Sequence, residues 1–305
     1  MLTEEAFTYQ KCNICPRGCG VDRHSSAGFC KAGTFPVLAR AALHYWEEPC
    51  ISGSRGSGAL FFSGCNLRCV YCQNAEISRK PAGREVSSGR LCELFYELKE
   101  KGANNINLVT ADIWLPTVAE AISRAKEEGF ELPFILNTSA YITVESLKKL
   151  EGLIDIYLPD LKYLRSEDAG RYSLAADYPE AAGHAIDEMV RQQPDCHFRD
   201  TKEGPMMTRG VLLRHLLLPG KLIAAKQIVK YLHERYGDHI YISLLDQYTP
   251  PEGLSGFPEL LKRPTGREYK SLTDYAAALG ITKAYVQSPE AAVSDYIPAF
   301  DGSGL

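Results

Sequence analysis

The sequence lacks the features that would attach the chain to a membrane or to nucleic acid. In 305 residues, no uninterrupted apolar segment approaches the roughly 20 residues that a membrane-spanning helix needs. Nor does a basic start lead into an apolar run and a small-residue cleavage site, as in a secretory signal. The formal net charge of −4 offers no excess of positive charge to nucleic acid or to an anionic membrane. We therefore expect a cytoplasmic protein without membrane or nucleic-acid partners.

Cysteine, in contrast, is plentiful, with ten residues in the chain. In a cytoplasmic protein cysteines ligate metals more often than they form disulfides. Cys50, isolated after Pro49, is interpreted as a buried thiol. Most of the others gather in the first quarter of the chain, which is too uneven for a disulfide framework; these are Cys12, Cys15, Cys19, Cys30, Cys65, Cys69 and Cys72.

The motif Cys65-x-x-x-Cys69-x-x-Cys72 directly follows a short apolar run, residues 59–62. Three thiolates on one tight loop can hold a single inorganic centre. A four-iron cluster normally takes one cysteine per iron, so this loop is one ligand short. One iron would then be open to a ligand that is not protein. A three-cysteine zinc site is the alternative.

A second group of cysteines lies in residues 1–50, where glycines stand at the bends between them. This segment has too little apolar surface to fold alone, so we expect a metal or the main body of the protein to order it. Zinc, a second iron–sulfur cluster and no metal at all remain open. The candidate ligands are Cys12, Cys15, Cys19 and Cys30.

From residue 51 onward, short apolar runs alternate with segments of helical periodicity. Six strand–helix units of this kind predict a parallel sheet with helical crossovers. Six is fewer than the eight units of a closed barrel, so we predict an α/β fold, a partial (β/α)6 TIM-type barrel, over residues 51–290. A cysteine-rich segment, 1–50, precedes it and a tail, 291–305, follows. The predicted strands are residues 59–62, 106–110, 134–137, 154–158, 211–218 and 240–245.

One segment, residues 163–208, interrupts the alternation with polar sequence and an expected helix over 179–193. Insertions between a strand and its helix often lie at the mouth of an active site, which favours a lid or a partner surface. An ordinary solvated crossover helix is the alternative.

Polar residues follow nearly every predicted strand. Parallel α/β folds place their sites at the carboxyl ends of the strands, so these side chains should converge on one face. Besides the three cysteines, the candidates are Thr110, Asp112, Asn137, Ser139, Asp160, Lys162, Arg214, His215 and Asp246.

Each candidate also has a purely structural interpretation. Arg214 and His215 are neighbours on a strand, so at most one of them enters the barrel. Asp160 and Lys162 share a face and could form a structural ion pair. The run 137–139 could be the cap of the helix that starts near Val144.

The cysteine motif, with Tyr71 just before the last cysteine, resembles the hallmark of the radical S-adenosylmethionine (radical SAM) superfamily. Further stretches resemble the homologues of the pyruvate formate-lyase activating enzyme, from about residue 12 to about residue 287. These stretches are residues 12–19, 137–141, 154–163, 214–220 and 246–250.

The resemblance implies a partial (β/α)6 barrel with a [4Fe–4S] cluster on the three cysteines. S-adenosylmethionine would bind the open iron, and an electron from a flavodoxin- or ferredoxin-type donor would split it to a 5′-deoxyadenosyl radical. The radical would abstract a hydrogen atom from a glycyl-radical enzyme, another peptide or a small molecule. The alternative is a non-catalytic iron–sulfur protein for electron transfer or sensing.

By the same resemblance, Tyr71 would pack near the adenine, and Asn74 would lie beside the cofactor. Asp160 and Lys162 look like the Asp-x-Lys of the activating enzymes, also near the cofactor. Asn137, Ser139 and Arg214 are further candidates for cofactor binding because they follow or lie on predicted strands.

Two positions depart from the family pattern. The Gly-Gly-Glu that receives the amino group of the cofactor is replaced by residues 108–112, where Thr110 or Asp112 would have to substitute for it. Ala140 stands where the group usually has glycine, which narrows the backbone conformations open to it.

Overall fold

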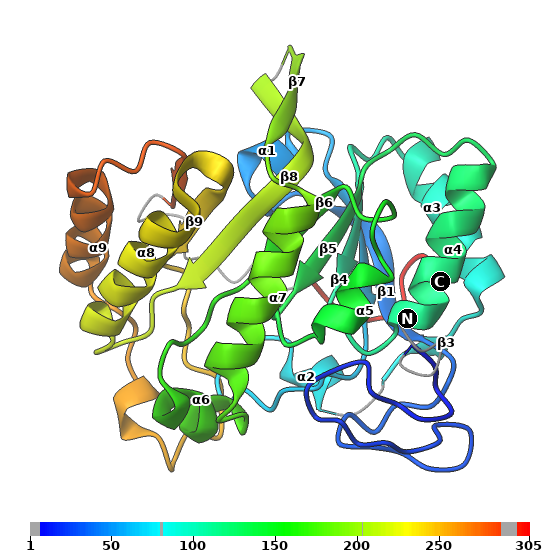
Figure 1. Cartoon of the computed structure of the whole chain (residues 1–305), viewed down its shortest axis with the longest axis horizontal. Coiled ribbons are helices and arrows are strands. Elements are labelled where there is room, and N and C mark those ends of the chain that lie inside the picture. Colours follow the sequence, from blue (N-terminus) through cyan, green and yellow to red (C-terminus); the bar gives the residue numbers. More distant parts are fainter. Residues whose placement is uncertain (1–6, 80–81, 203, 288–297) are drawn as a thin grey trace.

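The computed structural model describes residues 7–79, 82–202, 204–287 and 298–305. Its framework is a ten-stranded sheet with the order β10-β9-β8-β6-β5-β4-β2-β1-β3, and β7 pairs with β8 outside this path (Figure 1). The strands are β1 (Val37–His44), β2 (Ser57–Phe62), β3 (Arg84–Glu85), β4 (Ile106–Val109), β5 (Phe134–Thr138), β6 (Ile156–Pro159), β7 (His197–Thr201), β8 (Gly204–Leu216), β9 (Tyr241–Leu245) and β10 (Ala284–Val286).

Helices cover the outside of this sheet, and local sequence features stand at the start of several of them (Figure 1). The Ser87 side chain caps α3 by accepting a bond from the Arg90 amide, and Pro116 stands in the first turn of α4. The helices are α1 (Pro49–Ser52), α2 (Ala75–Ser78), α3 (Ser88–Glu100), α4 (Leu115–Glu127), α5 (Val144–Lys148), α6 (Ser166–Ser173), α7 (Tyr178–Gln192), α8 (Leu222–Tyr236) and α9 (Gly266–Ala278), with short 3-10 turns at Gly237–His239 and Pro258–Leu260.

The predicted partial barrel is confirmed. The six predicted strands correspond to β2, β4, β5, β6, β8 and β9, and neighbours in this run are parallel. The short strand β10, which the sequence did not predict, extends the run by one more parallel strand beside β9. The register places Val109 beside Asn137 and Thr138 beside Pro159, so the polar residues that follow these strands meet at one edge.

The sheet also continues on its other side, before the predicted boundary at residue 50. There β1 pairs antiparallel with β2 from Leu38 to His44. The chain end lies along β1, where the Ala41 amide donates to the Ser303 carbonyl. Of the predicted tail, residues 291–297 lie outside the described residues, as do residues 288–290 of the predicted barrel.

The insertion at residues 163–208 is divided between two ends of the molecule. Helix α7 turns a buried face, including Ala182 and Ile186, towards the sheet, as a crossover helix does. The β7–β8 hairpin contains the amino-terminal part of β8 and projects away from the carboxyl ends of the strands (Figure 1). It is therefore not a lid over the predicted site. The parts of the insertion that reach that site are Tyr163, α6 and the start of α7, where the Tyr178 hydroxyl donates to the carbonyls of Ser139 and Asp160 at 2.9 and 2.8 Å.

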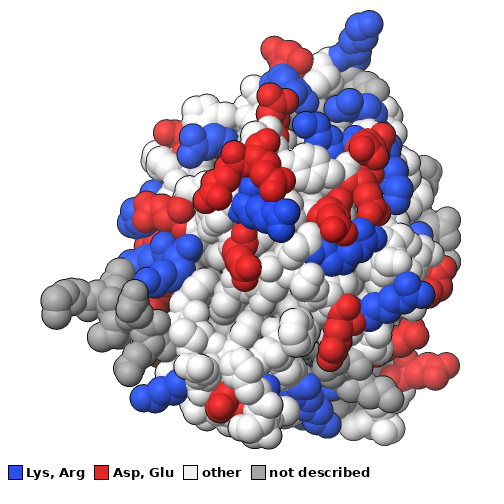
Figure 2. Space-filling view, turned by 90° about the vertical axis from the view of Figure 1, so that its right-hand side faces the viewer, with Lys and Arg blue, Asp and Glu red and all other residues white. Residues whose placement is uncertain are grey.

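The surface beside α3 and α4 carries both signs of charge. Figure 2 shows positive and negative side chains interspersed over the upper part of this face, with fewer charged groups below. In the part of the chain that the structure describes, no helix has the length and apolar character needed to cross a membrane.

Candidate active site

The cysteine loop follows β2 directly and is fixed by hydrogen bonds on both sides. Gly64 adopts a φ of 84°, a backbone conformation that favours glycine, and the chain turns there. Asn66 is buried and its amide donates to the Tyr141 carbonyl at 2.6 Å. Arg68 donates to the carbonyls of Cys65 and Phe29, at 2.7 Å each. The loop is therefore held rigidly at the end of the strand.

All three cysteines of the motif line one cavity of about 250 Å³ at the carboxyl ends of the strands. They are free and half-buried. The Sγ of Cys69 lies 3.0 Å from the Ser173 hydroxyl, and that of Cys72 lies 3.4 Å from the Ser78 hydroxyl. Burial raises the pKa of the Cys65 and Cys69 thiols, so a nearby positive charge would be needed to ionise them.

A chain of hydroxyl groups leads from Tyr71 to Cys69. The Tyr71 and Tyr163 hydroxyls are 2.6 Å apart, and Tyr163 lies 2.9 Å from Ser173, which contacts the Cys69 sulfur. The amides of Arg68 and Val70 donate to carbonyls at the end of α6. The insertion therefore helps to fix the position of the cysteine loop through the hydrogen bonds that the loop makes with the end of α6.

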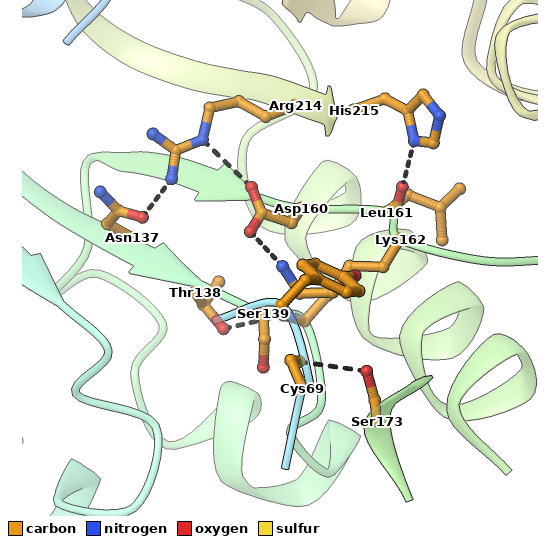
Figure 3. A network of polar contacts seen from close by, with 12 residues as sticks. Cys69, Asn137, Thr138, Ser139, Asp160, Leu161, Lys162, Ser173, Arg214 and His215 are labelled. Carbon is orange, nitrogen blue, oxygen red and sulfur yellow. Dashed lines mark hydrogen bonds and ion pairs between the residues drawn. The ribbon is translucent and has the colours of Figure 1, made fainter. Parts of the chain in front are cut away.

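A network of charged groups forms another part of the cavity wall (Figure 3). Lys162 donates to Asp160 at 2.6 Å, and the Arg214 Nε donates to the same carboxylate at 3.2 Å. Burial acts to raise the pKa of Asp160, but Lys162 and Arg214 together hold it below its usual value. The predicted ion pair therefore exists, and it belongs to the lining of the cavity.

Glu47 completes this network and was missed by the sequence analysis. Its carboxylate accepts bonds from Arg214 Nη1 at 2.9 Å, Asn107 at 2.8 Å and Asn137 at 3.2 Å. Arg214 also donates to the Asn137 side-chain oxygen. Glu47 lies in the loop after β1, and its sequence neighbourhood has no motif that points to a site.

Most of the predicted cofactor-binding residues line the cavity, but Asp112 does not. It is fully buried, and its carboxylate accepts bonds from the amide and hydroxyl of Ser139 at 3.3 and 3.1 Å. The structure thus places Asp112 behind Ser139. The predicted residues that do line the cavity are Tyr71, Asn74, Thr110, Asn137, Ser139, Asp160, Lys162 and Arg214.

Several of the alternative interpretations are resolved. Arg214 points into the cavity, whereas His215 points away and its Nδ1 lies 2.8 Å from the Leu161 carbonyl (Figure 3). The cap of α5 is Thr143, whose hydroxyl accepts from the Ser146 amide, so residues 137–139 are not that cap.

Thr110 and Ala140 both adopt a φ of 61°, which is unfavourable for residues with a side chain. These two positions follow β4 and β5, where the family pattern has glycines. The sequence replaces the glycines, but the backbone keeps the conformation that favours them.

The four N-terminal cysteines gather around a separate and much smaller cavity of about 20 Å³. All four are free. Within the described ranges, no group of three or more His, Cys, Asp or Glu side chains is arranged to hold a single metal ion. Arg17 and Arg23 also line this cavity. The Nη2 atom of each guanidinium is buried and has no hydrogen-bond partner among the described residues.

This N-terminal segment is joined to the cysteine loop. The Arg17 Nε donates to the Asn66 carbonyl at 3.0 Å, and Asn66 lines the smaller cavity. Arg23 is held by the carbonyls of Gly33 and Ile113, at 2.7 and 2.6 Å. The N-terminal segment and the cysteine loop are therefore in direct contact through Asn66.

Comparisons with known proteins agree with the motif. Residues 60–190 match the sequence model of the radical SAM superfamily. An uncharacterized protein of Methanocaldococcus jannaschii is 24% identical over 285 residues, which cover 91% of this chain and 77% of that protein.

Solved structures match parts of the chain at low identity. SuiB of Streptococcus suis bound to S-adenosylmethionine is 12% identical with a TM-score of 0.48, over 76% of this chain and 50% of SuiB. A domain of a pyruvate formate-lyase-activating enzyme of Bacteroides vulgatus is 14% identical with a TM-score of 0.40, over 57% of this chain and 91% of that domain. The chain thus spans about half the length of SuiB. The motif and the family model thus agree that residues 60–190 are similar to the radical SAM superfamily.

Proposed function

We propose that this chain is a radical SAM enzyme in which Cys65, Cys69 and Cys72 hold a [4Fe–4S] cluster and the adjoining cavity binds S-adenosylmethionine. The match of residues 60–190 to the radical SAM superfamily supports S-adenosylmethionine-dependent radical chemistry. The observation that carries the proposal is that the three thiols share one cavity with the polar residues of four strand ends. When bound, the cluster and S-adenosylmethionine would supply a 5′-deoxyadenosyl radical for hydrogen abstraction.

In this proposal, the residues of the chain bind the cluster and S-adenosylmethionine and orient them. Thiolates are the ligands that iron–sulfur clusters prefer, and Lys162 stands beside Cys69 as a fixed positive charge. Thr110, at the position of the missing Gly-Gly-Glu, has its side chain at the cavity and takes the contact to the cofactor's amino group. Asp112 acts only through Ser139, whose position it fixes.

The substrate is proposed from the sequence motifs alone. Their resemblance to the activating enzymes favours a glycyl-radical enzyme as one candidate, with another peptide or a small molecule as the other. A flavodoxin- or ferredoxin-type protein would supply the electron. A non-catalytic iron–sulfur protein is the competing function, and it would not cleave S-adenosylmethionine.

Anaerobic reconstitution, reduction and an assay for 5′-deoxyadenosine test the proposal. Wild-type protein should release 5′-deoxyadenosine, and Cys65→Ala should release none. Cys92→Ala is the matched control, because Cys92 is buried in α3 and does not line the cavity. If a reduced paramagnetic cluster is present and wild type forms no 5′-deoxyadenosine, the enzymatic function is wrong. If Cys65→Ala remains as active as wild type, the cluster ligands are wrong.

We also propose a metal centre at Cys12, Cys15, Cys19 and Cys30, with zinc as the first candidate and an iron–sulfur cluster as the second. A metal on four thiolates carries net negative charge, and the free guanidinium nitrogens of Arg17 and Arg23 would stabilise it. Binding would have to draw the thiols closer together.

Metal analysis of a Cys12→Ala, Cys15→Ala double variant tests this centre, with Cys196→Ala as the control for loss of an unrelated thiol. Loss of one zinc, or of iron beyond that of the first cluster, would identify the metal. An unchanged metal content would overturn the proposal.

A further inference from the structure

A second cavity, of about 220 Å³, adjoins the candidate active site. It lies between the loop that follows β1 and the strands β8, β9 and β10. The two cavities have a common wall, made by Trp46, Glu47, Arg214, Leu245 and Gln247. A molecule in this second cavity would therefore lie next to the cavity that the cysteines line.

Glu48 is the unusual side chain of this second cavity. It is only 7% exposed, and its backbone carbonyl is fixed by the amides of Ile51 and Ser52. Ser243 of β9 lies close to the carboxylate, but neither carboxylate oxygen has a hydrogen-bond partner of ordinary geometry among the described residues. Burying a carboxyl group without partners is costly, so a ligand that donates hydrogen bonds to Glu48 would offset this cost.

The neighbouring charges do not compensate Glu48. Arg214 is the nearest cation, but its three guanidinium nitrogens already donate to Glu47, Asp160 and Asn137. Burial raises the pKa of Glu48, Arg214 lowers it and Glu47 raises it again, with a net rise. Two carboxylates thus face one guanidinium in this cavity, and that guanidinium is shared with a third carboxylate.

Aromatic side chains line the same cavity. Trp46, which is 47% exposed, stands at the common wall, and Tyr285 of β10 lies on the other side. Ring faces attract cations, most strongly in partly desolvated sites. A buried carboxyl group beside two aromatic rings is chemically suited to an ammonium group and unsuited to an anion.

We propose that this second cavity is the subsite for a protonated amine of the substrate, whose N–H groups donate to the Glu48 carboxylate between Trp46 and Tyr285. The proposal rests on the proposed function, because it places the substrate beside the cavity assigned to S-adenosylmethionine. It narrows the substrate to a compound or peptide that carries an amine. Arg214 and Glu47 form the wall between the two cavities and keep the amine apart from the cluster side.

Ligand-observed NMR on the reconstituted protein tests the subsite with n-butylammonium as the probe. Butyrate and n-butanol are the probes of matched shape with negative and zero charge. We expect n-butylammonium to bind, and butyrate and n-butanol to bind at least about tenfold more weakly. Equal binding of n-butylammonium and n-butanol would overturn the proposal without the need for any variant.

Glu48→Gln keeps the shape of the side chain and removes its charge. It should weaken n-butylammonium binding by about tenfold or more, because a bond to a charged acceptor is lost. Glu93→Gln is the control, since Glu93 lies on the exposed side of α3. Unchanged binding in Glu48→Gln would overturn the subsite. A parallel assay of 5′-deoxyadenosine keeps the two proposals apart, because fragment binding requires no cleavage of S-adenosylmethionine.

The source of the amine is decided by competition. Putrescine represents a free amine, and the tripeptide Gly-Lys-Gly with blocked ends represents a lysine side chain. Displacement of n-butylammonium by either supports the subsite and shows which source fits. Displacement by neither, at concentrations that saturate the probe's own binding, would overturn the assignment to substrate.

Discussion

At the scale of single residues, the side chains of β8 point alternately to the two faces of the sheet, so two adjacent residues lie in different environments. Arg214 enters the cavity, where it joins Glu47 and Asp160. His215 points to the other side and is 4% exposed, against the Leu161 carbonyl. Burial lowers the pKa of His215 to about 4, so the imidazole is neutral in the folded protein at neutral pH.

We predict that His215 makes the folded state less stable in mild acid. In the unfolded chain its pKa returns to about 6.5, so the unfolded chain binds more protons between about pH 6.5 and pH 4. Stability from this group is complete above that window and is lost as pH falls through it. Between pH 6.5 and pH 5 the loss is about 2 kcal/mol.

Urea unfolding at pH 5, 6 and 7.5 measures this effect in wild type and in His215→Gln. The variant should lose stability at pH 7.5 but show a flatter profile towards pH 5. Asp112 works in the opposite direction, because burial raises its pKa to about 6 and its contribution is lost as pH rises from about 4 to 6. Asp112 is present in both proteins, so the difference between them isolates His215. Parallel profiles would contradict the prediction.

The residues that could be predicted from the sequence are those that directly follow a strand. The place of Asp160 or Ser139 depends only on the strand before it and on the parallel register. Glu47 and Glu48 could not be found in this way, because they reach the barrel through a loop that no local pattern marks. Asp112 was expected at the cavity, but the left-handed turn at Thr110 leaves it behind Ser139.

At the scale of elements, local signals were reliable where the sequence contains them. Ser87 caps the start of α3, and Gly102, with a φ of 91°, follows its end. The capping box of Thr265 and Glu268 at the start of α9 is an equally clear signal that the prediction did not use. The strands β1 and β10 have no such signal, because their pairing depends on distant partners.

The end of α6 offers a test of backbone strain. Leu174 caps this helix with a φ of 52° and a ψ of 39°, a left-handed conformation, and its side chain is 56% exposed. Glycine adopts this conformation without steric cost, so Leu174→Gly should stabilise the protein by about 0.5–1 kcal/mol. Ala277→Gly, in the exposed last turn of α9, should destabilise it by up to about 1 kcal/mol. Thermal or urea unfolding of both variants compares them, and destabilisation by Leu174→Gly would refute the strain argument.

At the scale of the whole molecule, the parallel run is open, and one loop reaches across it. The loop after β1 carries Glu47 to Arg214 of β8, and α1 continues from that loop towards the same strand. The repeated strand–helix units predicted the run of strands but not this connection. The strand–helix repeats predict which strands are neighbours in the sheet. They do not predict a contact between the two sides of the open barrel, because that contact forms only when the whole chain folds.

The Glu47–Arg214 pair should therefore hold the two sides of the open barrel together. Its atoms lie 2.9 Å apart, with side chains only 9% and 13% exposed. Removing one partner leaves a buried charge uncompensated, so Glu47→Ala should cost about 3 kcal/mol or more of stability. Arg214→Ala should cost at least as much, since it also removes one of the two cations that pair with Asp160.

A double-mutant cycle decides whether the pair acts as a unit. The double variant Glu47→Ala, Arg214→Ala should lose less free energy of unfolding than the sum of the two single losses, by about 1–3 kcal/mol. The reason is that the second substitution removes the buried charge that the first leaves without a partner. Urea unfolding measures all four proteins, and Arg90→Ala with Glu93→Ala, an exposed pair on α3, is the reference cycle with coupling below about 1 kcal/mol. If the buried cycle is as additive as the exposed one, the loop is held by packing alone, and Glu47 does not close the barrel.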